Sequence, residues 1–175
     1  LRLRPVERSH TAEIQNAASV REVADTMISR AHPYPAGEAA GYVARRQSER
    51  AAGRSAVFAI EDKVSGTFRG LIEVRDIDRE HSQGELSFWL TVDAWGRRYM
   101  SDAVQAVVQY AFDSLGLNRL YAYHMVRNPA SGRVLEKNGF QQEGLLRQRV
   151  KKWGQFEDVA LWAILRHEWR AGHGE

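Results

Sequence analysis

The sequence has 175 residues, 43% hydrophobic and 27% charged, with a formal net charge of +3. These are ordinary globular values, and a chain of this length buries about 68–70% of its surface on folding, so residues 1–175 are expected to form one domain. There is no cysteine, which excludes disulfides, thiolate metal sites and cysteine nucleophiles and favours a cytoplasmic location.

The sequence predicts neither a membrane span nor a secretion signal, because no apolar run approaches the roughly 20 residues that a bilayer requires. Basic and acidic residues alternate along the chain, so a nucleic-acid binder is not favoured. The charges indicate a solvated surface. The alternative is a local basic site for an anionic ligand, such as a coenzyme with several phosphates.

The first third of the chain predicts one strand and two helices. Alternation of apolar and charged residues indicates a strand over Leu1–Val6. Hydroxyl caps and an early acid at Ser9–Glu13 start a helix that is expected to reach about Ile28. The prolines in His32–Pro35 break it, because proline fixes φ and disfavours helix before it. A second helix is expected over Glu38–Ala51.

A period of two then indicates strands. Ala56–Glu61 and Gly70–Ile77 form an expected hairpin around Val64–Thr67, and Glu85–Val92 is the third strand of this run. The most regular helix of the chain follows, and Gly116 stands where its left-handed cap belongs. Its apolar stripe consists of Ala103, Val104, Val107, Val108, Ala111, Phe112 and Leu115.

The last third predicts strand, helix and a final hairpin. Arg119–Val126 is apolar and aromatic on both faces, as in a buried strand. A helix opens at Asn128-Pro129 with a capping side chain and ends at Asn138-Gly139. Leu145–Lys151 and Asp158–Leu165 are the closing strands. The order predicts an α/β (α+β) fold, a mixed sheet with helices on both faces, but identifies no enzyme by itself.

The turn between the third strand and the regular helix is a candidate anion site. The first N–H groups of a helix have no partner inside it and lie at its positive dipole end. Gly96 permits a tight turn, Arg97 and Arg98 add positive charge, and Ser101 offers a hydroxyl. Alone, this is a weak signal for phosphate binding.

The surrounding segments resemble a known superfamily. Glu85–Leu90 followed by Trp95–Ala103 resembles motif A of the GNAT superfamily of N-acetyltransferases. Asn128–Ser131 with Leu135–Phe140 resembles the next motif, in the form of the RimJ/RimL branch, the ribosomal-protein-alanine N-acetyltransferases. The resemblance covers most of the chain. It is highly specific for fold and coenzyme and much less specific for the acceptor.

The resemblance implies that acetyl-CoA binds where two parallel strands of a mostly antiparallel sheet splay apart, here Glu85–Val92 and Arg119–Val126. Backbone groups of Leu90, Thr91 and Val92 would pair with the pantetheine arm. The pyrophosphate would lie on the turn, whose residues are Gly96, Arg97, Arg98, Tyr99, Met100 and Ser101.

The turn departs from the family pattern, Gln/Arg-x-x-Gly-x-Gly/Ala, at its first and last places, which are Asp93 and Arg98. Since the donors are backbone amides, an arginine at 98 still supplies one if its φ is negative. We expect coenzyme binding to survive.

Glu85 is the first candidate for the general base that takes a proton from the acceptor amine, directly or through water, because related enzymes carry a glutamate at this strand position. The alternative is a strand-edge carboxylate in solvent. His81 is a second candidate, although a loop histidine is more often a surface residue. His124 is more readily explained as a hydrogen-bonded core histidine.

The proton for the leaving thiolate has a less obvious donor. Many superfamily members carry a tyrosine after Leu135, where this chain has Glu136, as the RimJ/RimL branch does. The branch implies that Ser131 contacts the coenzyme sulfur, unless its hydroxyl only bonds the helix backbone. Asn128 would contact the pantetheine or acetyl end while capping the helix, and an amide near Leu90 would stabilise the oxyanion.

The expected reaction is direct acetyl transfer to a primary amine, without a metal. An α-amine costs roughly 1 kcal/mol to deprotonate at pH 7 and a lysine about 4.6. With one uncertain base, the first expectation is a protein or peptide N-terminus. A small-molecule amine is the alternative, and a non-catalytic acyl-CoA sensor is another. Ribosome association and a homodimer also stay open. The candidate aromatic lining of the acceptor pocket is Tyr34, Phe88, Trp89 and Trp153.

Overall fold

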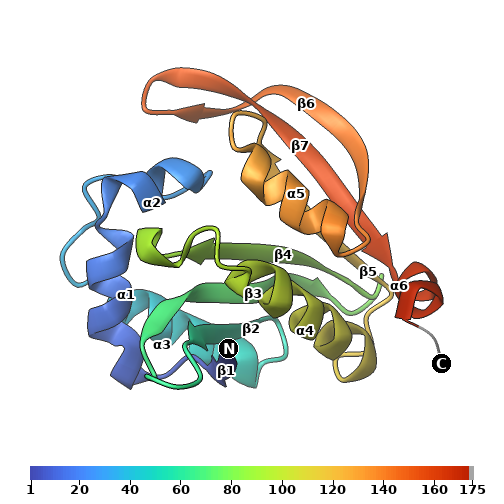
Figure 1. Cartoon of the computed structure of the whole chain (residues 1–175), viewed down its shortest axis with the longest axis horizontal. Coiled ribbons are helices and arrows are strands. Elements are labelled where there is room, and N and C mark those ends of the chain that lie inside the picture. Colours follow the sequence, from blue (N-terminus) through green and yellow to red (C-terminus); the bar gives the residue numbers. More distant parts are fainter. Residues whose placement is uncertain (174–175) are drawn as a thin grey trace.

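The computed structural model describes residues 1–173 and consists of one seven-stranded mixed sheet with helices on both faces (Figure 1). The strand order is β1-β2-β3-β4-β5-β7-β6, and within the described chain only β4 and β5 are parallel neighbours. This confirms the expected fold class. The strands are β1 (Arg2–Pro5), β2 (Ala56–Glu61), β3 (Phe68–Asp78), β4 (Gln83–Leu90), β5 (Arg119–Met125), β6 (Gln141–Lys152) and β7 (Gln155–Leu165).

Most helices lie where the sequence predicts them, with two exceptions. The single helix expected from Ser9 to Ile28 is wrong, because Val20 is extended (φ −72°, ψ 125°) and separates α1 from α2. The helix at the C-terminal end was not expected. The helices are α1 (Thr11–Ala18), α2 (Arg21–Thr26), α3 (Glu38–Ala51), α4 (Tyr99–Asp113), α5 (Pro129–Lys137) and α6 (Arg166–His173), with short 3-10 turns at Arg8–His10 and Val92–Ala94.

Each face of the sheet has its own hydrophobic core. On one face, α4 packs through residues such as Phe112 on Leu86 of β4 and Leu120 of β5. On the other, α1, α2 and α3 cover a core that includes Trp89. Leu86 and Trp89 belong to different cores because successive side chains of a strand point to opposite faces. The two faces of β4 therefore pack against two different hydrophobic cores.

The parallel pair is short, and this creates the opening in the sheet. β4 and β5 pair only from Gln83 to Glu85 against Arg119 to Tyr121, and then diverge. The splayed parallel pair that the resemblance implies is therefore present. β4 also ends at Leu90, two residues earlier than expected, because Val92 starts a 3-10 turn.

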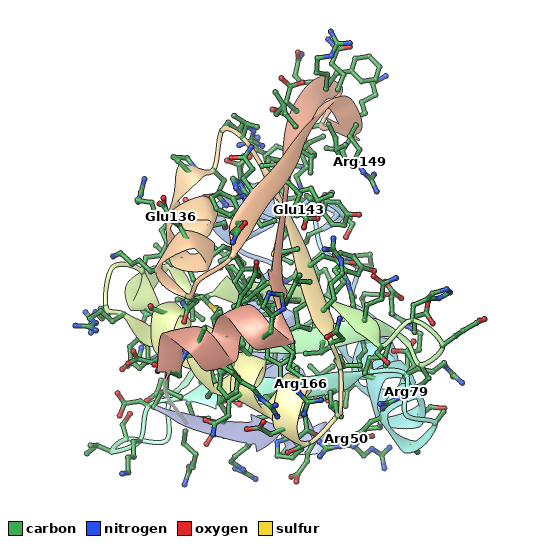
Figure 2. All side chains as sticks on the ribbon, turned by 90° about the vertical axis from the view of Figure 1, so that its right-hand side faces the viewer. Arg50, Arg79, Glu136, Glu143, Arg149 and Arg166 are labelled. Carbon is green, nitrogen blue, oxygen red and sulfur yellow. The ribbon has the colours of Figure 1, made fainter. Side chains whose placement is uncertain are left out.

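The β6–β7 hairpin is longer than the two strands predicted for it and rises beyond the rest of the sheet (Figure 2). Its turn has two residues, Trp153 (φ 48°) and Gly154 (φ 80°), both in the left-handed region. Such primed turns match the twist of a hairpin. The register shifts between Leu146 and Val150, which marks a bulge in β6.

Candidate active site

A cavity of about 650 Å³ opens where β4 and β5 separate, and the first turns of α4 and α5 form its walls. The volume lies within the range of about 300–1,000 Å³ of ligand pockets. Its lining residues are Thr26, Phe88, Trp89, Leu90, Ala94, Trp95, Gly96, Arg97, Arg98, Tyr99, Met100, Ser101, Asn128, Ala130, Ser131, Arg133, Val134 and Lys137. All six predicted residues of the turn, from Gly96 to Ser101, are among them.

The turn before α4 contains two residues with a left-handed backbone, and one residue separates them. Gly96 has φ 70° and Arg98, at the N-cap of α4, has φ 66°. The condition set for the amide of Arg98, a negative φ, is therefore not met. An L-residue in this conformation costs about 1–2 kcal/mol, which explains why the family pattern has glycine in this place. The first N–H groups of α4, which begin at Tyr99, have no acceptor within the helix and border the cavity.

Four cations border the cavity, two from each side. Arg97 and Arg98 come from the turn, and Arg133 and Lys137 come from α5. Arg133 and Lys137 are four residues apart and so share one helix face. Sequence reasoning missed both of them, although this spacing was a signal for them. A cavity with helix N–H groups and four cations fits a ligand with several phosphates.

The β2–β3 hairpin holds the turn in place. The hydroxyl of Tyr99 donates to Asp62 Oδ2 over 2.6 Å, and Asp62 also accepts from the N–H groups of Val64 and Ser65 over 2.9 Å each. These bonds, that of Ser65 above all, hold the pKa of Asp62 well below its usual range. The α4 start is thereby tied to a neighbouring hairpin.

Asp93, the first departure from the family pattern, has a local partner as well. It forms an ion pair with Arg69 of β3. The Thr91 hydroxyl and this guanidinium lower the pKa of the Asp93 carboxyl. The carboxylate thus ties the turn to β3 of the sheet.

One of the backbone N–H groups expected to meet the pantetheine arm, that of Thr91, already has a partner in the sheet. Thr91 N–H donates to Arg69 O of β3 over 2.8 Å, and neither Thr91 nor Val92 lines the cavity. Since successive residues of a strand direct their backbone groups to opposite sides, those of Phe88 and Leu90 point into the splayed gap. Leu90 O already accepts from Trp95 Nε1 over 3.2 Å. Leu90 therefore lines the cavity together with Phe88, whereas a contact of Val92, in the 3-10 turn, with the pantetheine arm stays a prediction.

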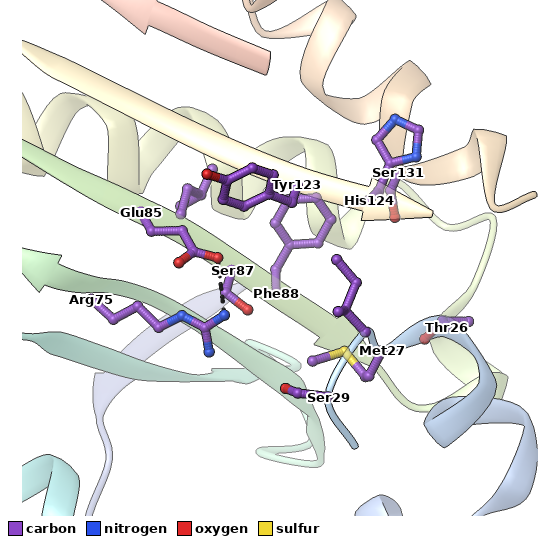
Figure 3. Close-up of a pocket in the computed structure, with 12 residues that line it drawn as sticks. Thr26, Met27, Ser29, Arg75, Glu85, Ser87, Phe88, Tyr123, His124 and Ser131 are labelled. Carbon is purple, nitrogen blue, oxygen red and sulfur yellow. Dashed lines mark hydrogen bonds and ion pairs between the residues drawn. The ribbon is translucent and has the colours of Figure 1, made fainter. Parts of the chain in front are cut away.

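A second, smaller cavity of about 50 Å³ adjoins the first and shares Thr26, Phe88 and Ser131 with it. The end of α2 and the segment after it form one side of this cavity, where Figure 3 shows Thr26, Met27 and Ser29. Its other lining residues are Met27, Ile28, Ser29, Arg75, Glu85, Leu86, Ser87, Tyr123 and His124. The two cavities meet at the end of the paired part of β4 and β5.

Glu85 lies at one side of the small cavity and Ser131 at the other (Figure 3). Glu85 Oε1 accepts from Arg75 over 2.9 Å, and the Glu85 side chain is only 14% exposed. Arg75 also contacts Glu73, which pairs in turn with Arg46. Glu85 is thus an ion-paired carboxylate facing a cavity, not the solvated strand-edge group that was the alternative.

Asn128 and Ser131 are brought together at the start of α5. Asn128 Nδ2 donates to Ser131 Oγ over 3.1 Å. Asn128 occupies the N-cap position, but its side chain bonds no backbone group of the helix, so the expected capping bond is wrong. Because Ser131 Oγ accepts this bond, its own proton is available for a partner in the cavity.

The two candidate histidines have other roles. His124 Nδ1 donates to Met125 O over 2.8 Å, and Nε2 accepts from Trp162 Nε1 over 2.9 Å. Both nitrogens are occupied, which confirms the interpretation of a hydrogen-bonded core histidine. His81 is exposed and contacts Asp78 in the β3–β4 turn, away from both cavities.

The predicted aromatic lining is correct in part. Phe88 lines both cavities and Trp89 the larger one, whereas Tyr34 and Trp153 line neither. Trp153 instead stacks under the guanidinium of Arg21 at 4.3 Å. Within residues 1–173 no cluster of side chains suits a metal ion, and no helix is long and apolar enough to cross a membrane.

Residues 1–141 match the family described as the acetyltransferase (GNAT) domain. The chain belongs to this family of acetyltransferases. The match includes β4, the turn before α4 and the start of α5, which line much of the larger cavity.

Three relatives are similar to this chain in sequence, and the names of two of them give an acceptor. An uncharacterized N-acetyltransferase, p20, of Bacillus licheniformis is 34% identical over 67% of this chain and 66% of its own. A ribosomal-protein-serine acetyltransferase of Escherichia coli is 32% identical over 54% of this chain and 52% of its own. A spermidine N(1)-acetyltransferase of Vibrio cholerae is 26% identical over 64% of each. The matched segments thus span less than two thirds of these relatives.

The similarity in fold to a solved acetyltransferase structure extends over nearly the whole chain. A crystal structure of the Vibrio cholerae spermidine N-acetyltransferase, in complex with CoA and spermine, superimposes with a TM-score of 0.85 and covers 96% of each chain at 23% identity. This likeness concerns the fold.

Proposed function

We propose that the protein transfers the acetyl group of acetyl-CoA to the primary amine of a small molecule. The observation that carries the proposal is the pair of adjoining cavities, one large and cationic, the other small and lined by a single carboxylate, Glu85. The larger would hold the coenzyme and the smaller the amine-bearing end of the acceptor.

The larger cavity suits acetyl-CoA in its charge and in its backbone groups. The phosphates would lie on the N–H groups at the start of α4, with Arg97, Arg98, Arg133 and Lys137 close by. The pantetheine arm would run along the outward-facing backbone of Phe88 and Leu90, in the manner of an added strand. This order brings the thioester to the junction with the small cavity, beside Ser131.

The chemistry follows from what lines that junction. The amine nitrogen attacks the thioester carbon, and Glu85 takes the amine proton, directly or through a water. A backbone N–H of Phe88 or Leu90 stabilises the oxyanion. The carbon–sulfur bond then breaks, and the Ser131 hydroxyl, oriented by Asn128, donates a hydrogen bond to the departing thiolate. The thiolate takes up a proton from solvent, and Glu85 releases to solvent the proton that it accepted. The products are an amide and CoA.

Two observations favour a small acceptor over a protein N-terminus. The acceptor cavity has a volume of only about 50 Å³ and is closed on one side by Met27, Ile28 and Ser29. The Vibrio cholerae relative, matched over a larger share of this chain than the Escherichia coli one, is a spermidine acetyltransferase. A peptide N-terminus stays as the second candidate, since the Escherichia coli relative acts on a ribosomal protein.

Substitution of the proposed base tests the mechanism. In Glu85→Gln, we expect turnover with the best amine to fall by about 10²–10⁴-fold at neutral pH, as is typical for loss of a general base. The dissociation constant of CoA should stay within about twofold, because Glu85 does not line the larger cavity. The rate of CoA release measures turnover, and calorimetry measures the dissociation constant of CoA. Unchanged turnover would remove Glu85 from the mechanism.

A further inference from the structure

Lys152, at the tip of the β6–β7 hairpin, is buried although lysines are almost always exposed. It is only 4% exposed. Its Nζ donates to Met27 O over 2.6 Å and to Arg30 O over 2.7 Å. Burial lowers the pKa of this amine. The hydrogen bonds are therefore made in a poorly solvated place, where loss of a donor leaves carbonyls without a partner.

The two carbonyls belong to the segment that covers the small cavity. Met27, Ile28 and Ser29 line that cavity and lie between α2 and α3, outside any helix. Among the described residues, no side chain other than that of Lys152 donates to the carbonyls of Met27–Arg30. The position of this wall thus depends on a residue that is more than a hundred positions away in sequence.

Further contacts dock the same hairpin on the same region. Trp153 lies under the guanidinium of Arg21 on α2. Arg127, just after β5, joins Asp25 of α2 to Glu157 of β7 over 2.9 Å each. In Figure 1 the hairpin extends over α2 and the chain that leaves it. The hairpin is therefore fastened to the amino-terminal wall of the site at several points.

We propose that Lys152 is a positioning residue of the acceptor site, which fixes the Met27–Arg30 segment and thereby sets the shape of the small cavity. This inference rests on the proposed function for its kinetic consequence. Lys152 does not line the larger cavity, so its loss should affect the acceptor and spare the coenzyme. The β6–β7 hairpin then holds one wall of the acceptor site in place.

The test compares Lys152→Met with Lys151→Met. Lys151 is the adjacent residue and is exposed, with its amine over the ring of Phe156. We expect Lys152→Met to raise the KM of the acceptor by about tenfold or more, the effect of losing hydrogen bonds from a charged donor, with the KM of acetyl-CoA within about twofold. Lys151→Met should change neither. Equal effects of both variants, or equal rises in both KM values, would overturn the proposal.

Hydrogen exchange of the backbone amides in residues 28–31 gives a readout that needs no acceptor. Exchange there should be faster in Lys152→Met than in Lys151→Met, while α4 stays protected. If Lys152→Met does not fold, Lys152→Gln, which keeps an N–H donor group but has no charge and a shorter side chain, takes its place in both measurements. If the unaltered protein acetylates no amine, the proposed function is refuted. If exchange in residues 28–31 is the same in Lys152→Met as in Lys151→Met, the role of Lys152 is refuted.

Discussion

The left-handed backbone of Arg98 predicts how replacement by glycine changes the free energy of unfolding. Replacing Arg98 by glycine removes a strain of about 1–2 kcal/mol, because glycine adopts positive φ without penalty. The greater freedom of glycine in the unfolded chain costs about 0.5–1 kcal/mol. The net effect expected for Arg98→Gly is a rise of between about 0 and 1.5 kcal/mol in the free energy of unfolding.

Arg97→Gly is the matched control for this measurement. Arg97 is the adjacent residue, equally exposed and of equal charge, but its φ is not positive. It gains nothing from glycine and should lose about 0.5–1 kcal/mol. The two variants should therefore differ by about 1–2 kcal/mol, or roughly 2–8 °C in Tm for a chain of this size.

Denaturant unfolding of both variants at one pH and ionic strength measures this difference. Affinity for CoA should fall to a similar extent in both, because each loses one cation beside the phosphates. Equal stabilities for Arg98→Gly and Arg97→Gly would show that position 98 carries no backbone strain, and the explanation of the family glycine would then be incorrect.

Two further predictions concern residues around the site. Gly132→Ala should lower the free energy of unfolding by about 1–3 kcal/mol, because the added Cβ would lie 2.9 Å from His124 Nε2. Gly172→Ala in α6 is the control and should be neutral or stabilising, since its Cβ would meet nothing within 4 Å. Chemical denaturation compares the two variants, and equal stabilities would contradict the crowding at Gly132. Asp62 has a depressed pKa in the folded state, so its stabilising contribution is present above the unfolded value of about 4 and is lost as the pH falls below it. Asp62→Asn should therefore be less stable than the unaltered protein at pH 6 and approach it at acid pH, and a gap that is constant with pH would argue against this assignment.

The elements with a strong local pattern could be predicted from the sequence. The apolar stripe of α4 and the alternation in β2 place both within a few residues, and α3 runs from Glu38 to Ala51 as expected. The turn from Gly96 to Ser101, which lines the larger cavity, could be singled out because its residues are contiguous. The break at Val20 was missed because no proline or glycine marks it.

What could not be predicted depends on contacts between distant segments. Glu85 meets Arg75 through the β3–β4 register, and Lys152 meets Met27 through the fold of the hairpin over α2. A lysine in an exposed strand offers no local sign of burial. Similarly, the end of β4 at Leu90 depends on the 3-10 turn that starts at Val92, which no proline or glycine marks in the sequence.

The central claim, acetyl transfer to a small-molecule amine, is tested most directly by a competition. Isotopically labelled acetyl-CoA is offered with an equimolar mixture of spermidine, short monoamines and a peptide with a free N-terminus, and mass spectrometry identifies the labelled product. We predict label on a small amine, with at least about tenfold less on the peptide. Label confined to the peptide N-terminus, or on no acceptor while CoA still binds, would contradict the account.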